Sequence, residues 1–136
     1  MSEKIEEQVA EYFAKEHSFS FRALDNLLDL FDSLRDFSHH LSENHYYSEA
    51  INKKVMAINL DIHLLSLQLP ILETEGKTLN NEATIAILAG EKPTLNKAIF
   101  ETYKKKISNN KVRVVELNES LQVLVKEIKF EYNGKS

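Results

Sequence analysis

The sequence contains no cysteine and very little glycine or proline. Without cysteine the chain has neither a disulfide framework nor a thiolate metal site. Only three glycines and two prolines interrupt its 136 residues. So few helix breakers favour long helices that are joined by few turns.

The chain also lacks a strong charge excess and any apolar run near the ~20 residues that cross a bilayer. Its first residues, MSEKIEEQ, lack the basic start and apolar core of a secretory signal. A hydrophobic content of 43% and a formal charge of -4 are typical of one globular domain over residues 1–136. We therefore expect a cytoplasmic protein that binds no membrane and no nucleic acid, and whose acidity suits a basic protein partner.

The longest pattern lies between Lys97 and Tyr132, where apolar residues recur every three or four positions. This spacing predicts a long amphipathic helix, similar to one helix of a coiled coil. Such a helix needs partners along its length, so we predict that it mediates partner binding and homodimerisation. The predicted partner-binding residues are Tyr103, Ile107, Val114, Leu117, Leu121, Leu124 and Ile128.

Asn110 is the one polar residue on that face, and it follows Ser108 and Asn109. It is either a buried amide that fixes helix register or the site of a true break. If the helix breaks there, the valine-rich segment 111–132 becomes a strand.

The first third of the chain predicts two helices. One begins at Ser2 and ends near His17, and the next is capped by Ser20 and runs from about Phe21 to His40. The second helix is apolar over half its circumference. An acidic row lies on the opposite side: Asp25, Asp29, Asp32 and Asp36.

The segment from Tyr46 to Leu69 fits two patterns. As a helix it carries two apolar rows, which is typical of a helix that contacts neighbours on both sides. Residues 58–69 also alternate like a half-buried strand, although helical spacing extends further upstream and favours the helix. We expect Pro70 to end this element.

A loop over 73–79 is expected next, followed by a short helix over 82–89 that Gly90 closes. Thr94 is the predicted cap of the final helix. The predicted fold is thus all-α, an elongated bundle of four or five helices with a long C-terminal helix. The alternative is an α+β fold, if 58–69 and 111–132 are strands.

One motif has a named chemistry. Arg35, four intervening residues and His40 form a pattern that resembles the motif of HEPN-domain ribonucleases, in which a polar residue such as Asp36 follows the arginine. The resemblance implies a metal-independent ribonuclease that pairs two copies of a helical bundle. Arg35 would then stabilise charge on the phosphate and His40 would transfer or orient a proton. For both to face one cleft, the helix must kink between them, because they point about 140° apart on a regular helix.

Other polar groups suggest no cofactor or metal. His39 with Glu43, and His45 with Glu49, are spaced to share a helix face, but no repeated Glu-x-x-His motif accompanies them. The basic cluster over 104–106, with Lys111 and Arg113, is expected to be solvated or to pair with the acidic row. The sequence thus predicts a non-catalytic protein–protein interaction module, of the adapter, chaperone-like or inhibitor/immunity type. The ribonuclease is the alternative.

Overall fold

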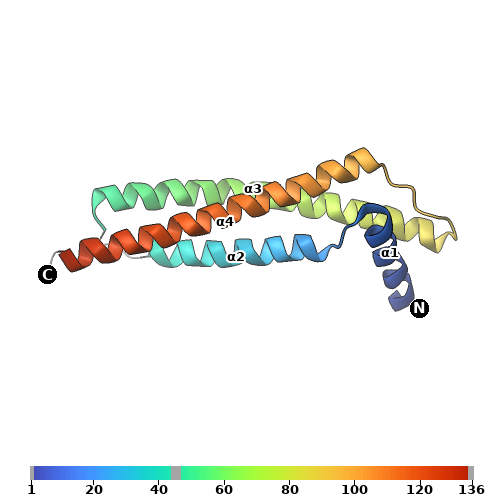
Figure 1. Cartoon of the computed structure of the whole chain (residues 1–136), viewed down its shortest axis with the longest axis horizontal. Coiled ribbons are helices and arrows are strands. Elements are labelled where there is room, and N and C mark those ends of the chain that lie inside the picture. Colours follow the sequence, from blue (N-terminus) through green and yellow to red (C-terminus); the bar gives the residue numbers. More distant parts are fainter. Residues whose placement is uncertain (1, 44–46, 135–136) are drawn as a thin grey trace.

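The computed structural model describes residues 2–43 and 47–134, and this part of the chain is helical with no strand. The predicted all-α, elongated bundle with a long C-terminal helix is confirmed, and the alternative with strands over 58–69 and 111–132 is wrong. The helices described are α1 (Ser2–His17), α2 (Arg22–Ser42), α3 (Glu49–Leu88) and α4 (Lys97–Gly134) (Figure 1).

The two long helices α3 and α4 form the frame of the bundle. With 40 and 38 residues, each is about 60 Å long. They pack against each other, and α2 packs against both of them over one half of the bundle (Figure 1). α1 lies at the other end, against the C-terminal part of α3. α2 therefore covers one half of the long pair, and α1 covers the other end of α3.

Pro70 lies inside α3 and does not end it, so the prediction of a helix end there is wrong. The expected loop over 73–79 and the short helix over 82–89 are also parts of this one helix. Pro70 is exposed, whereas the buried positions of α3 continue past it at alternating spacings of three and four. Burial along this face outweighs the local cost of the proline, about 3 kcal/mol. The buried face of α3 consists of Ile51, Val55, Ile62, Leu65, Leu69, Leu72, Gly76, Leu79 and Ala83.

Gly90 terminates α3 as predicted. Its φ of 75° is left-handed, its N–H donates to Ile87 O at 3.0 Å, and the N–H of Glu91 donates to Ala86 O at 2.8 Å. These two bonds are those of a Schellman motif.

The predicted caps of α2 and α4 need correction. Asn96, not Thr94, caps α4, because its Oδ1 accepts a hydrogen bond from the N–H of Ile99 at 3.1 Å. α2 begins at Arg22, and the N–H of Arg22 donates to the Oγ of Ser20 at 3.3 Å. Ser20 therefore bonds to the first residue of the helix, although it lies two residues before it.

The helix α4 is continuous through Asn110. The Nδ2 of Asn110 donates to the carbonyl of Lys106, one turn earlier, at 2.7 Å. The amide is half-buried and is satisfied within its own helix. It therefore neither breaks the helix nor bonds to a neighbouring helix in this structure.

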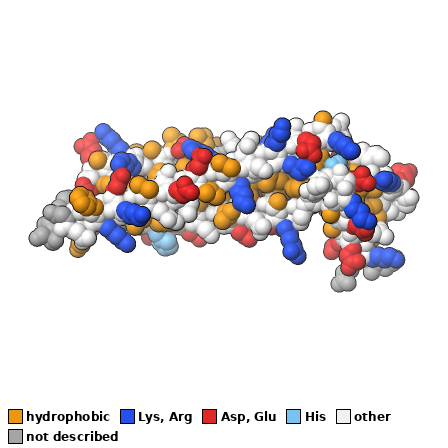
Figure 2. Space-filling model, in the orientation of Figure 1, with side chains coloured by type: hydrophobic (Ala, Val, Ile, Leu, Met, Phe, Trp, Pro, Cys, Tyr) orange, Lys and Arg blue, Asp and Glu red, His pale blue; other side chains and the backbone are white. Residues whose placement is uncertain are grey.

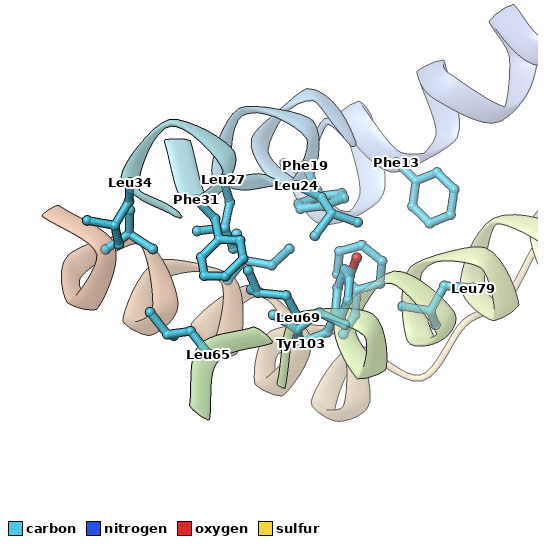
Figure 3. Packing of buried hydrophobic residues seen from close by; sticks show 14 of the residues in the cluster. Phe13, Phe19, Leu24, Leu27, Phe31, Leu34, Leu65, Leu69, Leu79 and Tyr103 are labelled. Carbon is cyan, nitrogen blue, oxygen red and sulfur yellow. The ribbon is translucent and has the colours of Figure 1, made fainter. Parts of the chain in front are cut away.

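The core follows the length of the bundle and is aromatic at the α1 end. Phe13, Phe19 and Tyr103 gather there from α1, the α1–α2 connection and α4 (Figure 3). Phe100 of α4 packs against all three rings, and aliphatic side chains, mostly leucine, make up most of the remaining core. Figure 3 shows Phe31 and Leu34 of α2 facing Leu65 of α3. This core positions every element that carries a candidate site.

A small polar network joins α2 to α3 within this apolar packing. Ser38 is 2% exposed and its hydroxyl donates to Asn59 Oδ1. The Nδ2 of Asn59 donates to Ser42 Oγ at 2.7 Å, and this hydroxyl donates to Ser38 O at 2.8 Å. Because each buried polar group has a partner, the network fixes the register of the two helices.

By length and composition, α3 is the one helix among the described residues that could cross a membrane. An 18-residue window in it has a mean hydropathy of 1.6, and 28% of that window is buried in the bundle. The core helix of a soluble protein satisfies the same criterion. Asn59 and Asp61 lie in this apolar part of α3 and bond to α2 and α4.

Tyr103 of α4 packs tightly against α3 at Gly76. A Cβ placed on Gly76 would lie 2.5 Å from the Tyr103 Oη. Tyr103 is 1% exposed, and its hydroxyl has no hydrogen-bond partner among the described residues. Burial raises the pKa of Tyr103 to about 12, and the nearby charges of Glu75 and Asp25 add to this effect. The neutral hydroxyl thus fills the space that any larger residue at position 76 would need.

We predict that Gly76→Ala lowers the free energy of unfolding by about 1–3 kcal/mol, because its methyl group would collide with the Tyr103 hydroxyl. In a Tyr103→Phe background the loss should shrink or reverse, since alanine favours a helix by about 1 kcal/mol over glycine. Tyr103→Phe alone should be neutral or stabilising, because it removes an unpaired buried hydroxyl. Urea unfolding of the four proteins measures this coupling, and equal losses in both backgrounds would contradict the collision.

Candidate docking surface

The predicted partner-binding face of α4 packs inside this chain. Ile128 is half-buried, and the other six residues are buried: Tyr103, Ile107, Val114, Leu117, Leu121 and Leu124. Most of them join the main core with α2 and α3, while Leu124 and Ile128 pack with Ile51 and Val55 of α3. In this conformation, neighbouring helices of the same chain already cover the face that the sequence assigned to a partner.

A different apolar surface is left uncovered on α3. Five large apolar side chains there are between 49% and 69% exposed, and we name them the outer stripe: Met56, Leu60, Leu64, Leu67 and Ile71. Their spacing of four, four, three and four places them within about 80° of one another around the helix. They lie on the side opposite the buried face of α3. Of the two apolar rows expected on this segment, one is in the core and the other faces solvent.

The outer stripe is also almost free of charge. Between Val55 and Leu72 the only carboxylate is Asp61, and no lysine or arginine occurs. Asp61 is directed to α4, where it pairs with Arg113 at 2.9 Å. Figure 2 shows hydrophobic side chains along the edge of the molecule that the first half of α3 forms. Large exposed apolar patches are unusual on monomers and often coincide with interaction sites, so the outer stripe is a candidate docking surface.

A second apolar feature, a recess, lies between the C-terminal half of α3 and the start of α4. It has a volume of about 570 Å³ and is open to solvent. Thr78 and Leu79 line one side, and Ile99, which is 60% exposed, lines the other. The ion pair between Lys106 and Glu75, 3.1 Å long, lies at its border. This recess contains fewer exposed apolar side chains than the outer stripe.

The structure does not bring Arg35 and His40 into one cleft of this chain. α2 continues without a break from Arg22 to Ser42, so the two side chains point about 140° apart. Arg35 is exposed, pairs with Asp32 at 3.2 Å and lies over the Phe31 ring. His40 is 78% exposed, with its Nδ1 3.9 Å from a Glu43 oxygen. The ribonuclease activity stays an untested prediction.

The remaining polar candidates occupy the surface. His39 Nε2 lies 2.9 Å from Glu43 Oε1, and within the described ranges no three metal-binding side chains gather. The predicted pair of His45 and Glu49 involves a residue outside the described part.

The expected pairing of the basic cluster with the acidic row of α2 is not observed. Lys104 bonds to Glu101 and His17 O, and Lys106 bonds to Glu75. Arg113 bonds to Asp61 and Glu116. The four aspartates of the acidic row are exposed, and one of them, Asp32, pairs with Arg35 of its own helix. The acidic row therefore remains available to a basic partner.

Comparisons with protein-family models, with curated proteins and with solved structures give no match to this chain. The surfaces described above are thus the basis on which function is inferred.

Sequence patterns did not reveal one buried polar group, the His17 side chain at the end of α1. It is 4% exposed, and its ring stacks on Phe100 with centroids 4.3 Å apart. The Tyr12 hydroxyl accepts from the Leu95 N–H at 3.1 Å and forms a second hydrogen bond with His17 Nε2 at 3.0 Å. The direction of the bond between Tyr12 and His17 depends on the tautomer of the imidazole.

Burial lowers the pKa of His17, and the nearby positive charges of Lys104 and Lys97 lower it further. Glu16 and Glu101 oppose this shift. The fold thus favours the uncharged imidazole.

We predict that the free energy of unfolding decreases as the pH falls below about 6.5, the ordinary histidine pKa. As the pH falls, the unfolded chain binds the proton before the folded chain does. The stability contributed by the neutral His17 is therefore fully present above about pH 6.5 and is lost as the pH falls to the lower pKa of the folded state. One histidine limits this slope to about 1.4 kcal/mol per pH unit. Urea unfolding between pH 7.5 and 5, in steps of about half a unit, tests the window.

His17→Phe should flatten the slope in that window, whereas His63→Gln at an exposed position of α3 should leave it unchanged. A slope that persists in His17→Phe would assign the effect to other groups.

Proposed function

We propose that this chain is a non-catalytic protein-interaction module that docks through the outer stripe of α3. The observation that carries this proposal is the row of five exposed, uncharged apolar side chains on a helix whose opposite face holds the core. A helix that presents an apolar face is a common mode of protein recognition.

Burial of the outer stripe would supply a useful free energy. Each of its side chains is about half exposed, so covering it contributes about 1 kcal/mol. Five such contributions amount to several kcal/mol before the entropy cost of association is subtracted. A partner with an apolar helix face or groove could gain this energy, and the gain depends on contact along the whole stripe.

The acidic row on α2 adds a long-range electrostatic effect to this proposal. Its aspartates are exposed, and they supply a negative surface on a second helix of the same bundle. Because α2 packs on the buried side of α3, opposite the outer stripe, the acidic row would act at long range and raise the association rate of a basic partner. Adapters, chaperone-like proteins and inhibitors all act through contacts of this kind, and the identity of the partner decides among these three roles.

We expect the double substitution Leu60→Glu/Leu67→Glu to abolish partner capture, because two carboxylates would be desolvated in the interface. The measurement is quantitative mass spectrometry of proteins bound to the tagged full chain in lysate of its native cells. Val112→Glu/Val123→Glu is the matched control, since these α4 side chains are 56% and 55% exposed. Circular dichroism should show an unchanged helix content in both variants.

If both double variants reduced partner capture equally, or if neither reduced it, docking through α3 would be contradicted.

The same proposal predicts that the purified protein leaves RNA intact. Arg35 and His40 lie on different sides of a continuous helix, so one chain offers no joint site for phosphate and proton transfer. Labelled single-stranded RNA is incubated with the wild-type protein and with Arg35→Ala/His40→Ala. Equal RNA survival is expected, and cleavage by the wild-type protein alone would favour the ribonuclease.

A further inference from the structure

We propose that the partner of the outer stripe is a second copy of this chain, packed antiparallel about a two-fold axis that passes beside Leu64. This inference rests on the proposed function and names the occupant of its docking surface. Two features of the described residues carry it: the symmetric spacing of the stripe and the order of the charges at its two ends.

The spacing of the outer stripe is self-complementary. Positions 56 and 71 are equally far from the point between residues 63 and 64, and so are positions 60 and 67. In an antiparallel pair, Met56 of each copy meets Ile71 of the other, Leu60 meets Leu67, and Leu64 lies beside its own equivalent. A two-fold interface requires this reciprocity, in which residue i contacts residue j and j contacts i.

The charges beyond the two ends of the stripe favour the antiparallel orientation. Glu49 and Lys53 precede the stripe and are 89% and 77% exposed in their side chains. Glu75 and Lys77 follow it, and Glu75 is 34% exposed. Antiparallel packing brings Lys53 near Glu75 of the second copy and Glu49 near its Lys77. A parallel pair would instead place each of these charges beside its own equivalent, which is repulsive.

The same charges disfavour a lipid surface as the occupant. A helix that lies on a membrane carries an excess of lysine and arginine beside its apolar face. Here both ends of the stripe carry both signs of charge, and the whole chain has a formal charge of -4. The flanking charged residues are Glu49, Lys53 and Lys54 before the stripe and Glu73, Glu75 and Lys77 after it. These features suit a partner with the same mixed pattern, which a second copy supplies.

The length of the stripe sets the expected strength. From Met56 to Ile71 it covers 15 residue steps, or about 22 Å of helix. Two helices that meet over this length form an interface at the small end of the range for specific complexes. We therefore expect a dimer with a dissociation constant in the micromolar range, about 1–100 µM.

Single cysteines test the geometry directly, because the full chain has none of its own. In Leu64→Cys, the two thiols of an antiparallel dimer are adjacent, so mild oxidation should give a disulfide-linked dimer. In Met56→Cys, the matched control, they lie about 22 Å apart, beyond the reach of a disulfide. A mixture of Met56→Cys and Ile71→Cys should again form linked dimers.

Equal cross-linking of Leu64→Cys and Met56→Cys would overturn the antiparallel arrangement.

Sedimentation equilibrium of the full chain over 1–200 µM provides the second test. The wild-type protein and Val112→Glu/Val123→Glu should dimerise, whereas Leu60→Glu/Leu67→Glu should remain monomeric at every concentration. A wild-type monomer throughout, with no cross-link in Leu64→Cys, would overturn self-pairing. Stripe-dependent capture of a different protein would still support the proposed function, so the two failures are distinguishable.

Discussion

The close packing of Tyr103 on Gly76 is the contact on which the arrangement of the two long helices depends. The phenol ring belongs to α4, and its hydroxyl occupies the space where a side chain of α3 would stand. This contact fixes how the Tyr103 side chain of α4 seats on the α3 backbone. Aromatic rings from three segments then close around it, including Phe13, Phe19 and Phe100. The unpaired hydroxyl is a cost that the surrounding packing offsets.

The long pair leaves α3 with two different faces. α4 and α2 cover its inner side over one half of the bundle, and α1 and α4 cover it over the other. The chain has no further described helix to cover the outer stripe, so an apolar row stays in solvent. The proposals of a binding module and of an antiparallel dimer rest on this single feature, whereas His17 and the Ser38–Asn59 network serve the fold.

Sequence patterns predicted the extents of α1, α2 and α4 well because the apolar periodicity of each is regular, although the caps of α2 and α4 were wrong. They failed on α3 because Pro70 has a strong local effect, while the evidence against a helix end is spread over many residues. Reading Gly76 as a buried position would have shown that the three-and-four spacing continues from Leu69 to Ala83. A glycine adds nothing to an apolar pattern, and its role emerges only when Tyr103 is packed against it.

The sequence by itself favoured a helical chain over the α+β alternative and determined which residues form apolar rows if it is helical, since these follow from residue spacing and the scarcity of breakers. It could not determine which rows the chain would bury itself. That depends on how many helices are available and on which sides they pack, and both are properties of the assembled bundle. Only the tertiary structure therefore placed the apolar row of α4 in the core and left the outer stripe of α3 exposed.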